Sequence, residues 1–147
     1  MGTTYQISVF GKKGCDKCAV LKDRISKMLE KEEFKDFSMK YWDVETEEGM
    51  VMFCQTECLN PQRIPAMLVM KENGSGDYEP IPNPKMGTKD EVCGKSRLYQ
   101  YLGIQTDYSD EGKGVITPRM IKSVLDEARV CQGMVNLLLP DFSQSLR

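Results

Sequence analysis

The sequence contains no histidine among its 147 residues. Imidazole is therefore missing as a general base, as a proton shuttle and as a metal ligand, which excludes many hydrolytic mechanisms and the commonest metal sites. Six cysteines are present instead. We therefore expect the chemistry of this protein to depend on its thiols.

Strong net charge and long apolar runs are missing as well. A formal charge of −2 leaves no basic surplus for nucleic acid or for an anionic membrane surface, so we expect neither partner. No apolar run approaches the roughly 20 residues of a membrane-spanning helix, and residues 1–6 lack the charged and apolar blocks of a secretory signal. These absences predict a cytoplasmic location.

The composition is that of an ordinary globular protein, with 40% hydrophobic and 29% charged residues. The length favours a single domain over 1–147, because the chain is too short for two ordinary ones. Such a domain has its own core and does not need disulfides as staples. In a reducing compartment, closely spaced cysteines then indicate a redox site or a metal site.

The first half of the chain alternates between two kinds of hydrophobic pattern. The β-branched and aromatic run Tyr5–Phe10 ends at Gly11 and predicts a strand. From Cys18, less polar residues recur at steps of three and four and predict a helix that continues to about Glu32. Ser38–Val44 is a second apolar and aromatic run. This order predicts a right-handed βαβ unit with parallel strands.

The second half of the chain is expected to add two strands and two helices. Apolar spacing over Glu47–Cys58 predicts a helix, and Ala66–Met70 predicts a third strand. Residues 74–94 are rich in proline and glycine and therefore poor strand material, so we place the fourth strand within Ser96–Thr106. Thr117 followed by Pro118 is typical of a helix start, with an apolar face behind it.

Cys15 and Cys18 lie between the first strand and the first helix. A helix start presents unpaired N–H groups and the positive end of the helix dipole, which favour a thiolate at Cys15. Cys18 begins the apolar stripe and is expected to be shielded, so it attacks only after Cys15 has formed a mixed disulfide. Nearby charges act in both directions: Lys12, Lys13 and Lys17 favour the thiolate, and Asp16 opposes it.

Other roles for the cysteines remain open at this point. In one alternative, Cys15 and Cys18 are inert thiols. In another, they are half of a zinc site whose other two ligands are Cys54 and Cys58. Because Cys54 and Cys58 are four residues apart in a predicted helix, they share one face as core filler or form a second redox pair. We assign no role to the two remaining cysteines, Cys93 and Cys131.

Three segments resemble the glutaredoxin and thioredoxin superfamily. Val9–Cys18 is similar to the glutaredoxin active-site strand and loop, and Tyr41–Val44 to the second strand. Arg63–Val69 resembles the cis-proline loop and third strand, in a form closer to thioredoxin. The resemblance covers about 5–71. It implies an α/β thioredoxin fold, with a βαβ unit, a β-hairpin, a C-terminal helix and a four-stranded mixed sheet flanked by helices. The additions to this fold are an insertion at about 74–94 and a C-terminal extension at about 133–147.

The resemblance implies a thiol-disulfide oxidoreductase that reduces protein or small-molecule disulfides without a bound cofactor. By this resemblance, Cys15 is the attacking thiolate and Cys18 is the resolving thiol. Pro65 is expected to follow a cis peptide beside this pair, and the backbone of Ile64 to pair with an extended substrate. Lys12 matches the basic residue with which glutaredoxins bind glutathione. Disulfide-containing proteins are therefore expected as partners.

Several positions depart from the family pattern. Val9 replaces the buried acid of thioredoxins, and Arg63 replaces a threonine of glutaredoxins. The Gly-Gly-acid turn of glutaredoxins is missing, with Gly112-Lys113-Gly114 the nearest equivalent. The reductant is then glutathione or a flavoprotein reductase. A binding module is the alternative function, because the insertion and the extension provide additional surface for a partner.

Overall fold

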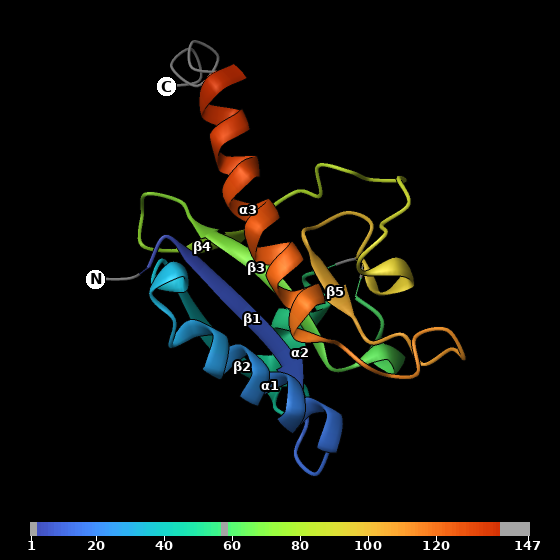
Figure 1. The fold of residues 1–147 in the computed structure, drawn as a ribbon. Helices are drawn as coiled ribbons and strands as arrows, with labels where there is room; N and C mark the ends of the chain where they lie inside the picture. Colours follow the sequence, from blue (N-terminus) through green and yellow to red (C-terminus); the bar gives the residue numbers. More distant parts are fainter. Residues whose placement is uncertain (1–2, 57–58, 139–147) are drawn as a thin grey trace.

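The computed structural model describes residues 3–56 and 59–138, with residues 131–138 described by their backbone alone. Strands and helices alternate in the first half of the chain, and the longest helix closes the described part (Figure 1). In chain order the elements are β1 (Tyr5–Gly11), α1 (Asp16–Leu29), η1 (Glu32–Phe34), β2 (Phe37–Asp43), α2 (Glu47–Cys54), η2 (Pro61–Arg63), β3 (Ala66–Glu72), β4 (Tyr78–Pro80), η3 (Gly94–Ser96), β5 (Gly103–Gln105) and α3 (Pro118–Leu138).

The strands form one mixed sheet in the order β2-β1-β3-β4, and β5 also pairs with β3. β1 and β2 run parallel in a register that places Val9 opposite Tyr41. β3 is antiparallel to β1, β4 and β5. A βαβ unit, an antiparallel hairpin and a C-terminal helix therefore follow one another, and the predicted thioredoxin fold is confirmed.

The fourth position of the sheet is filled by two short strands. β4 pairs with Met70–Glu72 and β5 with Ala66–Leu68, so both lie along the edge of β3 that β1 leaves open. The chain leaves this edge after β4 and returns to it at β5. The insertion into this interrupted strand is therefore residues 81–102, and not the 74–94 expected from the sequence, because Tyr78–Pro80 is part of the sheet.

The fourth strand predicted within Ser96–Thr106 is present there as β5, but it covers only Gly103–Gln105. Leu98 donates its N–H to the carbonyl of Gly103, which turns the chain back on itself before β5 begins. A Cβ at Gly103 would lie 2.4 Å from the Met67 carbonyl oxygen, so this close approach to β3 requires glycine. The stretch considered poor strand material contains β4, which tolerates Pro80 because it is an edge strand.

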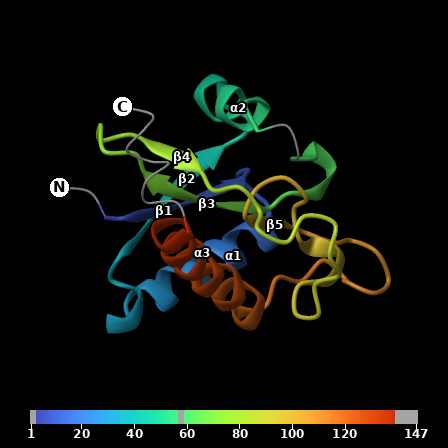
Figure 2. The same cartoon turned by 90° about the horizontal axis from the view of Figure 1, so that it is seen from above.

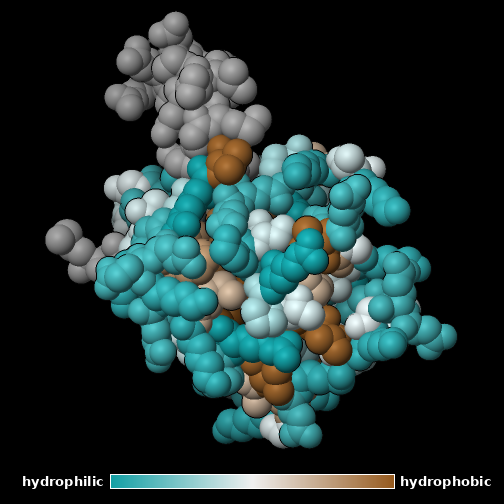
Figure 3. Space-filling model, in the orientation of Figure 1, coloured by the Kyte–Doolittle hydropathy of each residue, from teal (hydrophilic) through white to brown (hydrophobic). Residues whose placement is uncertain are grey.

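Helices cover both faces of the sheet. α1 and α3 lie on one face and α2 on the other (Figure 2). The α1 stripe predicted from the sequence is buried, with Leu21 and Ile25 packed against Ile7 and Val9 of β1. Phe53 of α2 packs on the opposite face. The surface over α1 and α3 is mostly hydrophilic, with small separate hydrophobic areas (Figure 3), because the apolar stripes of both helices face the sheet.

The ends of α2 and α3 differ from the predicted ones. α2 ends at Cys54 rather than near Cys58, which lies outside the described residues. α3 begins as predicted, since Thr117 Oγ1 accepts a hydrogen bond of 3.2 Å from the Met120 N–H. The helix continues to Leu138, so the C-terminal extension predicted at about 133–147 begins as part of α3, and residues 139–147 lie outside the described residues. None of the described helices combines the length and hydropathy required to cross a bilayer.

A buried ion cluster attaches the insertion to α3. Arg97 lies 2.6 Å from a carboxylate oxygen of Asp90 and 2.5 Å from one of Glu127, which belongs to α3. The Arg97 side chain is only 8% exposed. Arg97 Nε and Glu127 Oε1 are buried without a hydrogen-bond partner among the described residues. Arg97 also donates to the Asn83 side-chain oxygen at 3.3 Å, and the N–H groups of Val92 and Cys93 donate to Asp90.

Candidate functional site

Cys15 is the N-cap of α1. Its backbone is extended, and its Sγ accepts a hydrogen bond of 3.2 Å from the N–H of Cys18. This is one of the amide groups that a helix start leaves unpaired. The Cys15 side chain is partly exposed. A sulfur that is reachable from solvent and hydrogen-bonded at a helix start is suited to act as a nucleophile.

Cys18 lies one turn further on and is 1% exposed. Burial, together with a hydrogen bond to the Cys15 side chain, raises the pKa of the Cys18 thiol to about 12. At neutral pH this thiol keeps its proton. The two cysteines therefore differ in accessibility, as the sequence predicts, and both are free thiols.

Tyr41 is a polar neighbour of Cys18 that the sequence analysis did not identify. A Cβ at Gly11 would lie 2.5 Å from the Tyr41 hydroxyl and 3.0 Å from Cys18 Sγ, so glycine allows both groups to approach the strand. Burial, followed by the nearby Cys18, raises the pKa of Tyr41 to about 12. The hydroxyl therefore keeps its proton. It is a hydrogen-bond donor beside the sulfur, on the same side of the sheet as Val9.

The Ile64–Pro65 peptide is cis, and Pro65 is buried at the start of β3. The carbonyl of Pro65 accepts hydrogen bonds from the N–H and the hydroxyl of Thr106, at 3.2 Å and 2.7 Å. The Ile64 carbonyl accepts a hydrogen bond of 2.5 Å from the Tyr108 hydroxyl. This loop is therefore fixed by residues that follow β5.

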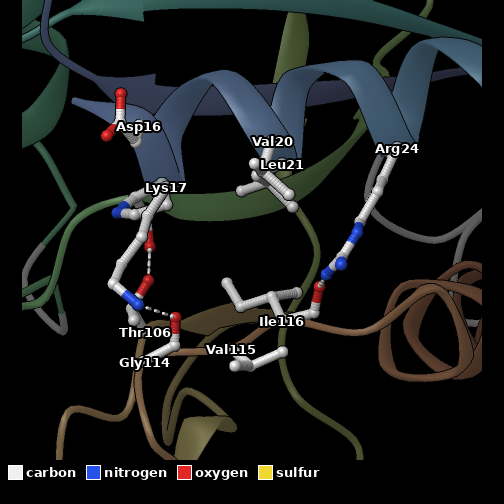
Figure 4. A pocket seen from close by; sticks show the side chains of 10 residues that line it. Asp16, Lys17, Val20, Leu21, Arg24, Thr106, Gly114, Val115 and Ile116 are labelled. Carbon is white, nitrogen blue, oxygen red and sulfur yellow. Dashed lines mark hydrogen bonds between the residues drawn. The ribbon is translucent and has the colours of Figure 1, made fainter. Parts of the chain in front are cut away.

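Pro65 and residues of the first turns of α1 line the same cavity, which has a volume of about 180 Å³. Its walls are α1 and the loop that leads to α3, where Val20 and Leu21 face Val115 and Ile116 (Figure 4). Two cations reach across it. Lys17 Nζ donates to the Gly114 carbonyl at 3.1 Å, and an Arg24 guanidinium nitrogen donates to the Ile116 carbonyl at 2.6 Å. An apolar hollow therefore lies beside Asp16 and Lys17, the two residues that follow Cys15.

A second hollow, of about 400 Å³, lies on the side of Cys15 toward β2. Tyr41 lines it together with both cysteines and several exposed lysines. Lys22 Nζ lies 4.8 Å from the centre of the Tyr41 ring, a cation–π distance. The predicted site residue Lys12 is exposed in this hollow, and Lys13 is beside it. This wall of the site therefore carries positive charge.

Cys54 and Cys93, the other cysteines whose side chains the structure describes, do not join this site. Cys54 is exposed on α2, on the opposite face of the sheet from α1, so its assignment to the core is wrong. The face of α2 that is buried contains Gly49 and Phe53 instead. Among the side chains of residues 3–56 and 59–130, no group of three or more cysteines or carboxylates is placed to hold a metal ion. Cys58, the fourth ligand of the alternative zinc site, lies outside these ranges.

The guanidinium of Arg63 is held by two backbone carbonyls. Its Nε donates to the Thr106 carbonyl at 2.9 Å, and its Nη2 donates to the Lys95 carbonyl at 2.7 Å. The guanidinium therefore attaches the cis-proline loop to the insertion, and this contact explains why a long basic side chain suits the position that is threonine in glutaredoxins.

Alkylation should separate the thiols by burial. In reduced protein at pH 7, we expect iodoacetamide to modify Cys15 and Cys54 first and to modify Cys18 and Cys93 at least about tenfold more slowly. Burial raises the pKa of Cys93 to about 11. Cys93 and Cys18 are therefore protonated at pH 7, and their sulfurs are not accessible to the reagent. Peptide mass spectrometry after timed labelling measures the order. Equal rates for Cys15 and Cys18 in folded protein would contradict it, and labelling in denaturant is the control.

The sequence matches no family model, and it matches no curated protein. Among solved structures, the chain is similar to oxidised mitochondrial thioredoxin 3 from Saccharomyces cerevisiae, with 14% sequence identity and a TM-score of 0.38. The match covers 52% of this chain and 63% of that thioredoxin. The order and directions of the strands establish the fold without this likeness.

Proposed function

We propose that this protein is a thiol-disulfide oxidoreductase that reduces disulfides of proteins and small molecules. The observation that carries this proposal is the partly exposed sulfur of Cys15, hydrogen-bonded at the start of α1 with the buried Cys18 thiol behind it. The cis peptide before Pro65 belongs to the same site, because Pro65 and the first turn of α1 line one cavity.

The reaction transfers two electrons in two exchanges. The Cys15 thiolate attacks one sulfur of the substrate disulfide, and the other substrate sulfur leaves as a thiolate that takes a proton. Cys18 then loses its proton and attacks the Cys15 sulfur. The substrate sulfur that was bound to Cys15 now leaves and takes a proton, and a Cys15–Cys18 disulfide remains. The substrate is reduced, and the dithiol of the protein is oxidised.

Tyr41 supports the second exchange. The Cys18 sulfur must become a thiolate in a buried place, where charge is costly. A protonated hydroxyl beside it can donate a hydrogen bond to that thiolate, and the lysines of the same hollow provide positive charge. Val9 stands where thioredoxins, by the resemblance, have a buried acid, so the polar group that assists Cys18 here is the hydroxyl of Tyr41 on the neighbouring strand.

Replacing the resolving thiol should trap the intermediate. In Cys18→Ser protein, we expect Cys15 to form a one-to-one mixed disulfide with a protein substrate that accumulates, because nothing displaces it. Non-reducing gels and intact mass spectrometry measure the adduct, which dithiothreitol should release. Cys15→Ser protein is the matched control and should form no adduct. An equal yield from both variants would overturn the proposed division of roles.

The reductant in this proposal is glutathione or a flavoprotein reductase. Lys12 is exposed beside Cys15, where a cation suits a carboxylate of glutathione. The basic side chain of Arg63 is held by two carbonyls and faces the insertion, so it is not directed to the same ligand. Reduction of the oxidised protein by glutathione, compared with thioredoxin reductase and NADPH, separates the two donors.

A further inference from the structure

Tyr108 lies over the cis-proline loop. It belongs to the segment between β5 and α3, its side chain is 48% exposed, and its hydroxyl donates a hydrogen bond of 2.5 Å to the Ile64 carbonyl. Burial, followed by the nearby Cys15, raises the pKa of Tyr108. The hydroxyl therefore keeps its proton at neutral pH. It is also close enough to Cys15 for the two groups to affect one another.

The occupied carbonyl is a backbone group that the proposed function needs. Pairing of an extended polypeptide with Ile64 takes the Ile64 carbonyl as acceptor and the Ile64 N–H as donor. Among the described residues, this N–H has no hydrogen-bond partner. An incoming chain therefore meets a free donor and an acceptor that Tyr108 already uses.

Tyr108 is held in place by contacts with α1. Lys17 Nζ lies 5.8 Å from the centre of the Tyr108 ring and donates to the Gly114 carbonyl. Gly114 has a φ of +71°, and a Cβ there would lie 3.0 Å from the ring and 2.7 Å from Lys17 Nζ. The absence of a side chain at Gly114 therefore allows the Tyr108 ring and the Lys17 ammonium to approach the backbone of Gly114 at the edge of the site.

We propose that Tyr108 caps the Ile64 carbonyl and thereby disfavours extended protein substrates relative to small disulfides. A polypeptide that pairs with Ile64 competes with the hydroxyl for this carbonyl, whereas a small disulfide reaches Cys15 without pairing there. The inference rests on the proposed oxidoreductase function. Because pairing exchanges the Tyr108 hydrogen bond for one to the polypeptide, a polypeptide binds the molecules in which the carbonyl is free. Its apparent affinity is therefore the intrinsic affinity multiplied by the fraction of such molecules.

Removing only the hydroxyl tests the cap. In Tyr108→Phe protein, we expect the KM for insulin to fall roughly two- to tenfold, the range that one hydrogen bond spans, and kcat to stay near its wild-type value. The KM and kcat for a small aromatic disulfide should not change. Dithiothreitol is the electron donor in both assays. Tyr99→Phe is the matched control, because Tyr99 is 66% exposed and belongs to the insertion.

The outcomes separate the cap from the function on which it rests. An unchanged KM for insulin in an active Tyr108→Phe protein overturns the cap alone. A raised KM also overturns it and makes Tyr108 a contact for the polypeptide. Equal decreases of KM for insulin and for the small disulfide point to a general opening of the site and overturn the proposed selectivity. A wild-type protein that reduces neither substrate above background overturns the oxidoreductase function together with the cap.

Discussion

Cys15→Ser is expected to lower kcat/KM for disulfide reduction by at least about a thousandfold, because a neutral hydroxyl does not attack a disulfide sulfur as a thiolate does. The substitution is clean in structural terms. Serine is itself a preferred N-cap, and its oxygen can accept the Cys18 N–H that Cys15 Sγ accepts in the wild type. Helix α1 should therefore start as before. Insulin reduction and reduction of a small disulfide, each followed with dithiothreitol, measure the loss.

Cys54→Ser is the matched control for this substitution. Cys54 is an exposed cysteine on the opposite face of the sheet, so its removal should leave kcat/KM unchanged. Full activity of Cys15→Ser protein would end the proposed mechanism. The alternative function of a binding module would then be favoured if a redox titration found thiols that never pair, in place of one two-electron transition within roughly −180 to −300 mV.

The first half of the fold was predictable because its signals are local. The run of apolar and aromatic residues before Gly11 predicts β1, and the spacing of Leu21, Ile25 and Met28 predicts the buried face of α1. The parallel pairing of β1 and β2 follows from the helix between them. The position of Cys15 at the helix start could be predicted for the same reason.

The interrupted fourth strand could not be predicted from local patterns. β4 contains only Tyr78–Pro80, and its pairing with β3 depends on an edge that β1 leaves open. The return of the chain at Gly103 depends on the backbone of Met67, which is distant in sequence. Tertiary contacts of this kind override strand propensity.

Two tyrosines of the site illustrate the same limit. Tyr41 is opposite Val9 in the register of the two parallel strands, so the pairing itself gave a signal for its position beside Cys18. Tyr108 gave none. It lies in a segment without periodicity, and its contact with Ile64 is visible only once the segment after β5 has been placed against the cis-proline loop.

Arg97→Met is expected to lower the free energy of unfolding at pH 7 by about 3–5 kcal/mol, because it leaves two carboxylates buried without their cation. The side chains of Asp90 and Glu127 are 13% and 11% exposed, and each lies against the Arg97 guanidinium. Methionine fills much of the volume, so the cost is mainly electrostatic. Urea unfolding measures it. Arg119→Met is the matched control, since Arg119 is exposed near the start of the same helix, and should change the value by at most about 0.5 kcal/mol.

The dependence of this deficit on pH separates charge from packing. Burial alone would raise the pKa of Asp90, but the N–H groups of Cys93 and Val92 and the Arg97 cation lower it overall. In the wild type, ionised Asp90 therefore contributes stability at neutral pH that is lost as the pH falls through its lowered pKa. Without the cation, the pKa of Asp90 rises, and protonation relieves the buried charge. We therefore expect the Arg97→Met deficit to shrink between pH 7 and pH 5, and Glu127→Gln to recover part of it. A deficit that is equal at both pH values would mean that Arg97 acts through its packing and not through its charge.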